Sequence, residues 1–248
     1  MNLVIDIGNS LTKTAVFNAS KLESFSSFEK ISRDVFKVLI AKNSEIKNII
    51  LSSVVEYDKS ISGFFKSKCK FIELSNETKI PIENLYHSKE TLGKDRLACA
   101  VGANSIFPNQ NVLAIDAGTC IKYDFVNSKN QYFGGGISPG IEMRFKALNQ
   151  FTDKLPLLNY KSFDKLVGQN TDESILSGVM NGVTEEGKGI VARYKEQYPD
   201  VKVVCTGGYM KFLEKIFNIS ANGNSNIFAD SFLVLKGLNE IINFNEKK

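Results

Sequence analysis

Hydrophobic and polar positions along this chain alternate with the two periods of an α/β protein. Short apolar segments of strand length alternate with longer segments in which apolar residues recur every three or four positions. The first half predicts strands at 47–54 and 70–74, and helices at 31–40, 57–66 and 95–106. The second half predicts a strand at 201–205, one or two helices over 171–197, and helices at 141–148, 209–217 and 231–244. This alternation favours sheets that are flanked by helices.

Further strands belong to an internal repeat. Residues 3–10 and 113–120 each form an apolar strand that ends in Asp-x-Gly and a small polar residue, and the second copy follows after 116 − 6 = 110 residues. Each copy continues into a second alternating segment, at 13–17 and 122–126, so each predicts a β-hairpin with Asp-x-Gly at its turn. Duplication of one α/β unit is the simplest explanation.

The length of the chain agrees with such a duplication. A chain of 248 residues fits one large domain or two compact ones. The helix predicted at 95–106 ends near Pro108, because proline cannot continue a helix. We therefore expect an α/β fold with two domains, at 1–108 and 109–248.

Composition excludes several classes of protein. The chain is 43% hydrophobic and 23% charged, which is typical of a soluble globular protein, and its net charge of +4 is spread without a run of like charges that would bind nucleic acid. We expect no membrane span and no signal peptide, because no apolar segment is long enough and a strand pattern begins at the first residues. Four widely spaced cysteines and a single histidine, His87, predict free thiols in a reducing cytoplasm and no zinc cluster.

The hairpin turns have the chemistry of phosphate-binding loops. Glycine lets backbone amides approach phosphate oxygens, and Asn, Ser and Thr side chains donate hydrogen bonds. In the first copy, Asp6 would face Mg²⁺, directly or through water, and Lys13 would supply a cation to the transferred phosphate. The nucleotide-binding residues of this loop are then Asp6, Ile7, Gly8, Asn9, Ser10, Leu11, Thr12 and Lys13. The alternative is a pair of tight turns whose glycines serve only the backbone, but two copies at equivalent places favour a nucleotide.

A third loop completes this pattern. The strand at 201–205 is followed by the turn Thr206-Gly207-Gly208 and a helix, an arrangement that suits a base or ribose lying against the backbone. The order of two phosphate loops and an adenosine turn is similar to that of the sugar kinase, Hsp70 and actin superfamily. The short chain and its segment 6–13 resemble the type III pantothenate kinases. The resemblance implies two duplicated ribonuclease-H-like domains, each a mixed sheet flanked by helices, with the active site in the cleft between them.

The segment 86–96 resembles the substrate motif of that family, a tyrosine seven residues before Gly-x-Asp-Arg at the start of a helix. Chemically, Asp95 is suited to accept the proton of an alcohol, and Arg96 can hold a carboxylate and keep Asp95 ionised. The alternative is a helix-terminal acid that counters the dipole. The resemblance implies that Asp95 is the general base and that pantothenate contacts Tyr86, Gly93, Lys94, Asp95 and Arg96. Many members have proline three residues after the tyrosine, where this chain has a lysine.

The second half carries three further segments of the resemblance. Asp116 corresponds to an aspartate that helps to bind a monovalent cation, K⁺ or NH₄⁺, and Thr119 to a threonine that contacts ATP. The segment 134–140 resembles a glycine-rich stretch of the family, and its local pattern predicts a turn. Thr171 corresponds to a threonine that reaches the substrate of the partner subunit in a homodimer, although its position alone suggests a helix N-cap.

The resemblance implies an enzyme that transfers the γ-phosphoryl group of ATP to the hydroxyl of pantothenate, with Mg²⁺ and a monovalent cation. The product would be 4′-phosphopantothenate, the first intermediate committed to coenzyme A. The expected assembly is a cytoplasmic homodimer. Two alternatives stay open at this point: a kinase of another small alcohol, and a non-catalytic regulator derived from the same scaffold.

Overall fold

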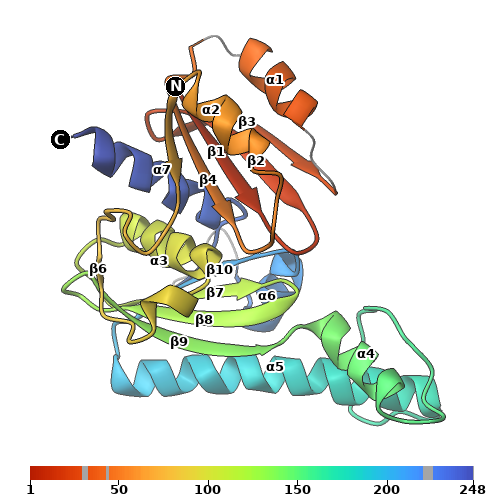
Figure 1. Ribbon diagram of the computed structural model, residues 1–248. Coiled ribbons are helices and arrows are strands. Elements are labelled where there is room, and N and C mark those ends of the chain that lie inside the picture. Colours follow the sequence, from red (N-terminus) through yellow and green to blue (C-terminus); the bar gives the residue numbers. More distant parts are fainter. Residues whose placement is uncertain (30–32, 43–44, 220–225, 248) are drawn as a thin grey trace. The chain divides into compact units, whose positions relative to one another are not determined.

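The computed structural model describes residues 1–29, 33–42, 45–219 and 226–247 (Figure 1). Its strands form a five-stranded and a six-stranded sheet. The elements of the first half are β1 (Asn2–Ile7), β2 (Thr12–Asn18), β3 (Lys21–Phe28), α1 (Arg33–Lys42), β4 (Asn48–Ser53), α2 (Ser60–Lys66), β5 (Lys70–Glu73), β6 (Glu83–Asn84), the 3₁₀ turn η1 (Lys89–Thr91) and α3 (Lys94–Ile106). Those of the second half are β7 (Val112–Ala117), β8 (Cys120–Val126), β9 (Gln131–Pro139), α4 (Ile141–Gln150), α5 (Thr171–Gln197), β10 (Lys202–Thr206), α6 (Met210–Phe217), β11 (Ile227–Ala229) and α7 (Leu233–Glu246).

The two sheets share one strand order, which confirms the predicted mixed α/β fold. The first sheet has the order β3-β2-β1-β4-β5, and the second has the order β11-β10-β7-β8-β9-β6. In the first sheet, β1 pairs antiparallel with β2 and parallel with β4. In the second, β10 pairs parallel with both β7 and β11. The series 3-2-1-4-5 therefore corresponds to 9-8-7-10-11, and β6 is an addition at the edge of the second sheet.

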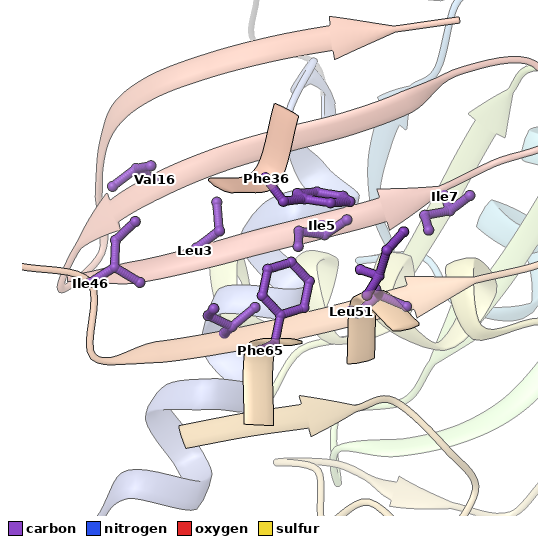
Figure 2. Packing of buried hydrophobic residues seen from close by; sticks show 10 residues of the cluster. Leu3, Ile5, Ile7, Val16, Phe36, Ile46, Leu51 and Phe65 are labelled. Atoms are coloured by element: carbon purple, nitrogen blue, oxygen red, sulfur yellow. The ribbon is translucent and has the colours of Figure 1, made fainter. Parts of the chain in front are cut away.

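Helices α1 and α2 pack on one face of the first sheet. Alternate residues of a strand point to opposite faces, and Leu3, Ile5 and Ile7 of β1 enter one apolar cluster with Phe36 and Phe65 from these helices (Figure 2). Every one of these side chains is at least 94% buried, so the hydrophobic effect favours this packing strongly.

The opposite face of the first sheet holds polar residues of β1. The side-chain Nδ2 of Asn2 donates to Oδ1 of Asn239 on α7 at 2.9 Å, and α3 packs against both α7 and β4. Because Asp6 lies four positions after Asn2, it points to this same face. The face that carries Asp6 is thus the one covered by the helices α3 and α7.

Two compact units can be distinguished in the chain. One comprises Met1–Gln110, Asp124–Gly134 and Phe232–Lys248, and the other comprises Asn111–Tyr123 and Gly135–Ser231. The predicted boundary at residue 108 stays a prediction. Among the helices of the described residues, none combines the length and the apolar character that crossing a membrane requires.

Most predicted elements are present, with one clear correction. The helix expected at 95–106 spans Lys94–Ile106, and 171–197 is one continuous helix. The predicted helix at 31–40 begins outside the described residues and continues in α1. The expected turn at 134–140 is wrong, because strand β9 runs through it to Pro139. The polar edge strand β3 was not predicted at all.

Candidate active site

The first predicted phosphate loop joins β1 to β2. Its turn closes with a hydrogen bond from the Gly8 amide to the Leu11 carbonyl, 3.0 Å long. Asn9 and Ser10 are exposed at the tip, whereas Asp6 is only 8% exposed. Asp6 and Lys13 are direct partners across the two strands. The loop therefore presents polar side chains to solvent, next to a buried carboxylate and a lysine on the two strands that it joins.

The predicted base lies in the first turn of α3, which is preceded by Gly93. One carboxylate oxygen of Asp95 accepts a hydrogen bond from the Arg96 amide at 2.9 Å. That same oxygen would lie 2.8 Å from a Cβ atom built on Gly93, closer than side chains normally approach. Gly93 therefore leaves room for the carboxylate, and this is the physical reason for a glycine two residues before Asp95.

The side chain of Arg96 is held by a carboxylate of the chain itself. Its Nε donates to Oδ1 of Asp124 at 3.0 Å and its Nη2 to the same oxygen at 2.7 Å, while the Tyr132 hydroxyl donates to that oxygen at 2.8 Å. Arg96 and Asp124 are 5% and 1% exposed.

Burial alone would lower the pKa of Arg96, but the hydrogen bonds and charge of Asp124 raise it above the ordinary value. Burial, followed by the charge of Asp124, raises the pKa of Tyr132. Neither Asp124 nor Tyr132 was predicted as a partner of Arg96, although an acid inside the apolar pattern of 120–126 was a usable signal.

Tyr86 lies beside this cluster even though the chain lacks the expected proline. The guanidinium carbon of Arg96 is 5.5 Å from the centre of the Tyr86 ring, and the ring of Tyr132 is 6.2 Å away. The ring also packs against Gly134, where a Cβ atom would lie 2.5 Å from Cδ2 of Tyr86. Gly134 also has a φ of 102°, which favours glycine. One glycine of the segment 134–140 thus leaves the space that the Tyr86 ring fills.

The second predicted phosphate loop joins β7 to β8. The Gly118 amide donates to the Cys120 carbonyl at 3.0 Å, which leaves Thr119 exposed at the tip. Asp116 is the carboxylate that precedes this turn. Its Oδ2 is 2.7 Å from Nζ of Lys122, and both side chains are 15% exposed. The two residues form a largely buried ion pair on the strands that flank the loop.

The predicted adenosine turn lies against this second loop. Strands β7 and β10 are parallel neighbours with Asp116 opposite Thr206. The following Gly207 has a φ of 100°, and a Cβ atom there would clash with the Ala117 carbonyl. The Tyr209 amide donates to that carbonyl at 3.0 Å. The structure therefore brings the second phosphate loop and the adenosine turn together within one unit.

Two tyrosines border the adenosine turn and were not predicted. The Tyr209 hydroxyl donates to Glu142 of α4 at 3.2 Å, and its ring meets that of Tyr160 edge to face with 5.3 Å between centres. Burial, and then the charge of Glu142, raises the pKa of Tyr209 to about 12. The phenol is therefore neutral and able to donate a hydrogen bond at physiological pH.

Thr171 is the first residue of α5 and is exposed. Its suggested role as the helix N-cap is wrong, because the side chain of Asn170 occupies that position and accepts from the Glu173 amide at 2.9 Å. Asparagine is among the best N-cap residues. The hydroxyl of Thr171 is therefore not needed to cap the helix.

The described residues contain no group of three or more His, Cys, Asp or Glu side chains that could hold a metal by themselves. Mg²⁺ bound with a nucleotide needs only one or two carboxylates, since phosphates and water supply the other ligands. Asp6, at the end of β1 beside the glycine turn, fits that requirement. All four cysteines are free thiols, and burial raises the pKa of Cys205 to about 12, which makes it unreactive.

Comparison with known proteins identifies the family. The type III pantothenate kinase family matches residues 2–193. The chain belongs to this family. It is 43% identical to the type III pantothenate kinase of Phocaeicola vulgatus, over 100% of both chains, and 42% identical to that of Christiangramia forsetii, over 99% of both.

Solved structures support the fold of this family member. A proposed Baf family transcriptional activator from Campylobacter jejuni is 24% identical and superposes with a TM-score of 0.61, over 99% of this chain and 100% of that one. A glucokinase from an Antarctic psychrotroph is 13% identical, with a TM-score of 0.51 over 98% of both chains. These matches show that the chain shares the fold of these two proteins.

Proposed function

We propose that this chain transfers the γ-phosphoryl group of ATP to the hydroxyl of pantothenate and so makes 4′-phosphopantothenate for coenzyme A synthesis. Membership of the family supports the reaction. The observation that carries the assignment of the site is the start of α3, where the Asp95 carboxylate lies over Gly93 and the next side chain, Arg96, is locked by Asp124 beside Tyr86.

The two hairpin loops would hold the nucleotide. Residues 6–13 and Thr119 offer backbone amides and hydroxyls to the phosphates, and Lys13 adds a positive charge. Asp6 would hold Mg²⁺, directly or through water, and the ion would neutralise charge on the phosphates. The adenosine turn at 206–208, with Tyr209 next to it, suits the base or ribose.

Asp95 would accept the proton of the attacking hydroxyl. Its carboxylate is partly exposed and hydrogen bonded to the adjacent amide, so its orientation is defined before substrate binds. Tyr86, Gly93, Lys94 and Arg96 are proposed substrate contacts. Since the Arg96 guanidinium already binds Asp124, we propose that it acts mainly by holding Tyr86 and the first turn of α3 in place.

A homodimer would complete the site through Thr171. In support, the segment before α5 carries apolar side chains in solvent: Phe151 and Leu166 are each 81% exposed and Val167 is 71% exposed. The backbone there is tethered, because the Leu166 carbonyl accepts from Ser177 of α5 at 2.6 Å. A second copy of the chain is the proposed occupant of this surface, with the enzyme working in the cytoplasm.

The monovalent cation expected at Asp116 fits this carboxylate poorly. The ammonium group of Lys122 already lies 2.7 Å from one oxygen. The other oxygen faces the backbone of Gly207, where a Cβ atom would lie 2.6 Å from it. K⁺ or NH₄⁺ is therefore assigned no role at this carboxylate in the proposed reaction.

A coupled assay with ATP, Mg²⁺ and pantothenate tests the reaction and its base. We expect Asp95→Asn to lower kcat by about 10²–10⁴-fold, the usual contribution of general base catalysis, with little change in the KM for ATP. Asp34→Asn is the matched control, since that carboxylate is 81% exposed in a surface pair with Lys37. No pantothenate-dependent rate in the wild type would refute the function and favour a sugar or another alcohol as substrate, or a regulator. A full rate in folded Asp95→Asn would refute the base.

A further inference from the structure

The ion pair between Asp116 and Lys122 suggests how the second phosphate loop obtains its positive charge. Lys122 lies on β8 between two buried residues, Ile121 and Tyr123, and only 15% of its side chain is exposed. Its Nζ is 2.7 Å from Asp116 Oδ2. A lysine this far desolvated is not an ordinary surface charge, and its ammonium is held at the carboxylate that precedes the turn at 118–119.

The internal repeat gives this lysine a counterpart. In both copies, a lysine on the second strand of the hairpin follows the Asp-x-Gly turn: Lys13 on β2 and Lys122 on β8. In the first copy the lysine lies opposite the aspartate in the strand register, and in the second it makes an ion pair with it. Both hairpins therefore carry an aspartate before the glycine turn and a lysine after it, on the two strands that the turn joins.

We propose that the Lys122 ammonium supplies the charge that a monovalent cation would otherwise supply at Asp116, so that this chain binds ATP without K⁺ or NH₄⁺. An ammonium on a lysine is a compact single positive charge with hydrogen-bond donors, as NH₄⁺ is. A second cation at the same carboxylate would be repelled by the first. This inference rests on the proposed nucleotide-binding role of residues 116–119.

Nucleotide binding by the full chain tests the proposal without pantothenate. A fluorescent ATP analogue is titrated with Mg²⁺ in choline chloride, and again with about 100 mM KCl or NH₄Cl at equal ionic strength, which keeps charge screening constant. For the wild type we expect a Kd that changes by less than about twofold between these salts. For Lys122→Ala we expect a Kd about tenfold higher in choline chloride, with most of the loss recovered in KCl or NH₄Cl.

Two variants make the result specific. Lys122→Arg keeps the charge and should stay independent of the added cation, and Lys188→Ala removes a charge from an exposed pair on α5 and should bind as the wild type does. If circular dichroism shows that Lys122→Ala is unfolded, Lys122→Gln takes its place, since glutamine keeps most of the side-chain volume.

Several outcomes overturn the proposal. One is a wild type that needs K⁺ for binding or does not bind the analogue. The others are a Lys122→Ala or Lys122→Gln protein that binds the analogue normally in choline chloride, or one whose weakened binding neither K⁺ nor NH₄⁺ restores. A failure of the proposed pantothenate reaction gives a different pattern, because binding of the analogue would keep its independence of K⁺ while phosphorylation was absent.

Discussion

At the scale of single residues, the lack of a side chain on Gly93 leaves room for the Asp95 carboxylate. The backbone of Gly93 has a φ of −58°, which any residue can adopt, so glycine is not needed there for its conformation. What it provides is space, because a Cβ atom would lie 2.8 Å from the carboxylate oxygen. With alanine at this position, the carboxylate of Asp95 could rotate away from the added methyl group at a small cost in free energy.

Gly93→Ala should therefore damage catalysis more than folding. We expect kcat to fall by about 10–10²-fold, because a displacement of about 1 Å at a reacting group can cost that much. The free energy of unfolding should change by less than about 1 kcal/mol, the usual range for substitutions at a helix N-cap. Urea denaturation and the coupled kinase assay measure the two effects.

Gly63→Ala is the control for this substitution. Gly63 lies inside α2, and an added Cβ atom there meets nothing within 4 Å. Activity should be unchanged and stability should rise by up to about 1 kcal/mol, since alanine favours a helix interior. A Gly93→Ala enzyme with the wild-type kcat would contradict the role assigned to this space.

At the scale of elements, the turn from β10 to α6 is built on the neighbouring strand β7. Gly207 packs on the Ala117 carbonyl with a positive φ, and the next residues tie the start of α6 to the same carbonyl through the Tyr209 amide. The position of the proposed adenosine turn is thus coupled to that of the second proposed phosphate loop. Two consecutive glycines in this turn have different constraints, which makes the coupling testable.

Gly207→Ala should destabilise the protein by about 1–3 kcal/mol, the cost of a strained backbone conformation, and it should weaken binding of ATP. Gly208→Ala should change the free energy of unfolding by less than about 1 kcal/mol, since its Cβ atom meets nothing within 4 Å. Urea denaturation of both variants gives the comparison. Equal destabilisation by the two would show that the contact with Ala117 is not what constrains this turn.

At the scale of the whole molecule, the exposed apolar side chains before α5 argue for a second copy of the chain. Single exposed hydrophobic residues are common, but Phe151, Leu157, Leu166 and Val167 lie in one segment of 17 residues and are 53–81% exposed. Hydrogen bonds hold the backbone at 165 and 166 to α5. The surface is therefore presented by an ordered segment close to Thr171 in the sequence.

Leu166→Glu should convert a dimer into a monomer and lower the pantothenate-dependent rate, because a charge buried in an apolar interface is costly. Light scattering coupled to gel filtration measures the mass, and the wild type should elute at twice the mass of one chain. Val38→Glu, on α1 and 51% exposed, is the matched control and should leave both mass and rate unchanged. A monomeric wild type, or a dimeric and fully active Leu166→Glu, would refute the dimer.

The sequence by itself determined the elements whose information is local. The two hairpins, the start of α3 and the strand–glycine–helix turn at 206–208 follow from periodicity and turn residues within about ten positions, and the structure has each of them. The duplication of one α/β unit was predicted because both copies of Asp-x-Gly lie at equivalent places, whereas the strand order that the two sheets share came from the structure. The polar edge strand β3 was not predicted, since its alternation of apolar and polar residues is weak and most of its residues face solvent.

Tertiary structure alone decided which distant residues contact the predicted site residues. The carboxylate that binds Arg96 comes from Asp124, 28 residues later, and the ring of Tyr86 rests on Gly134, whose segment looks like a turn and is a strand. The lysine beneath the second loop looked like an ordinary strand residue until its ion pair with Asp116 was seen. Such pairings depend on strand register and on burial, which bring side chains together across many residues and are not encoded in the local pattern.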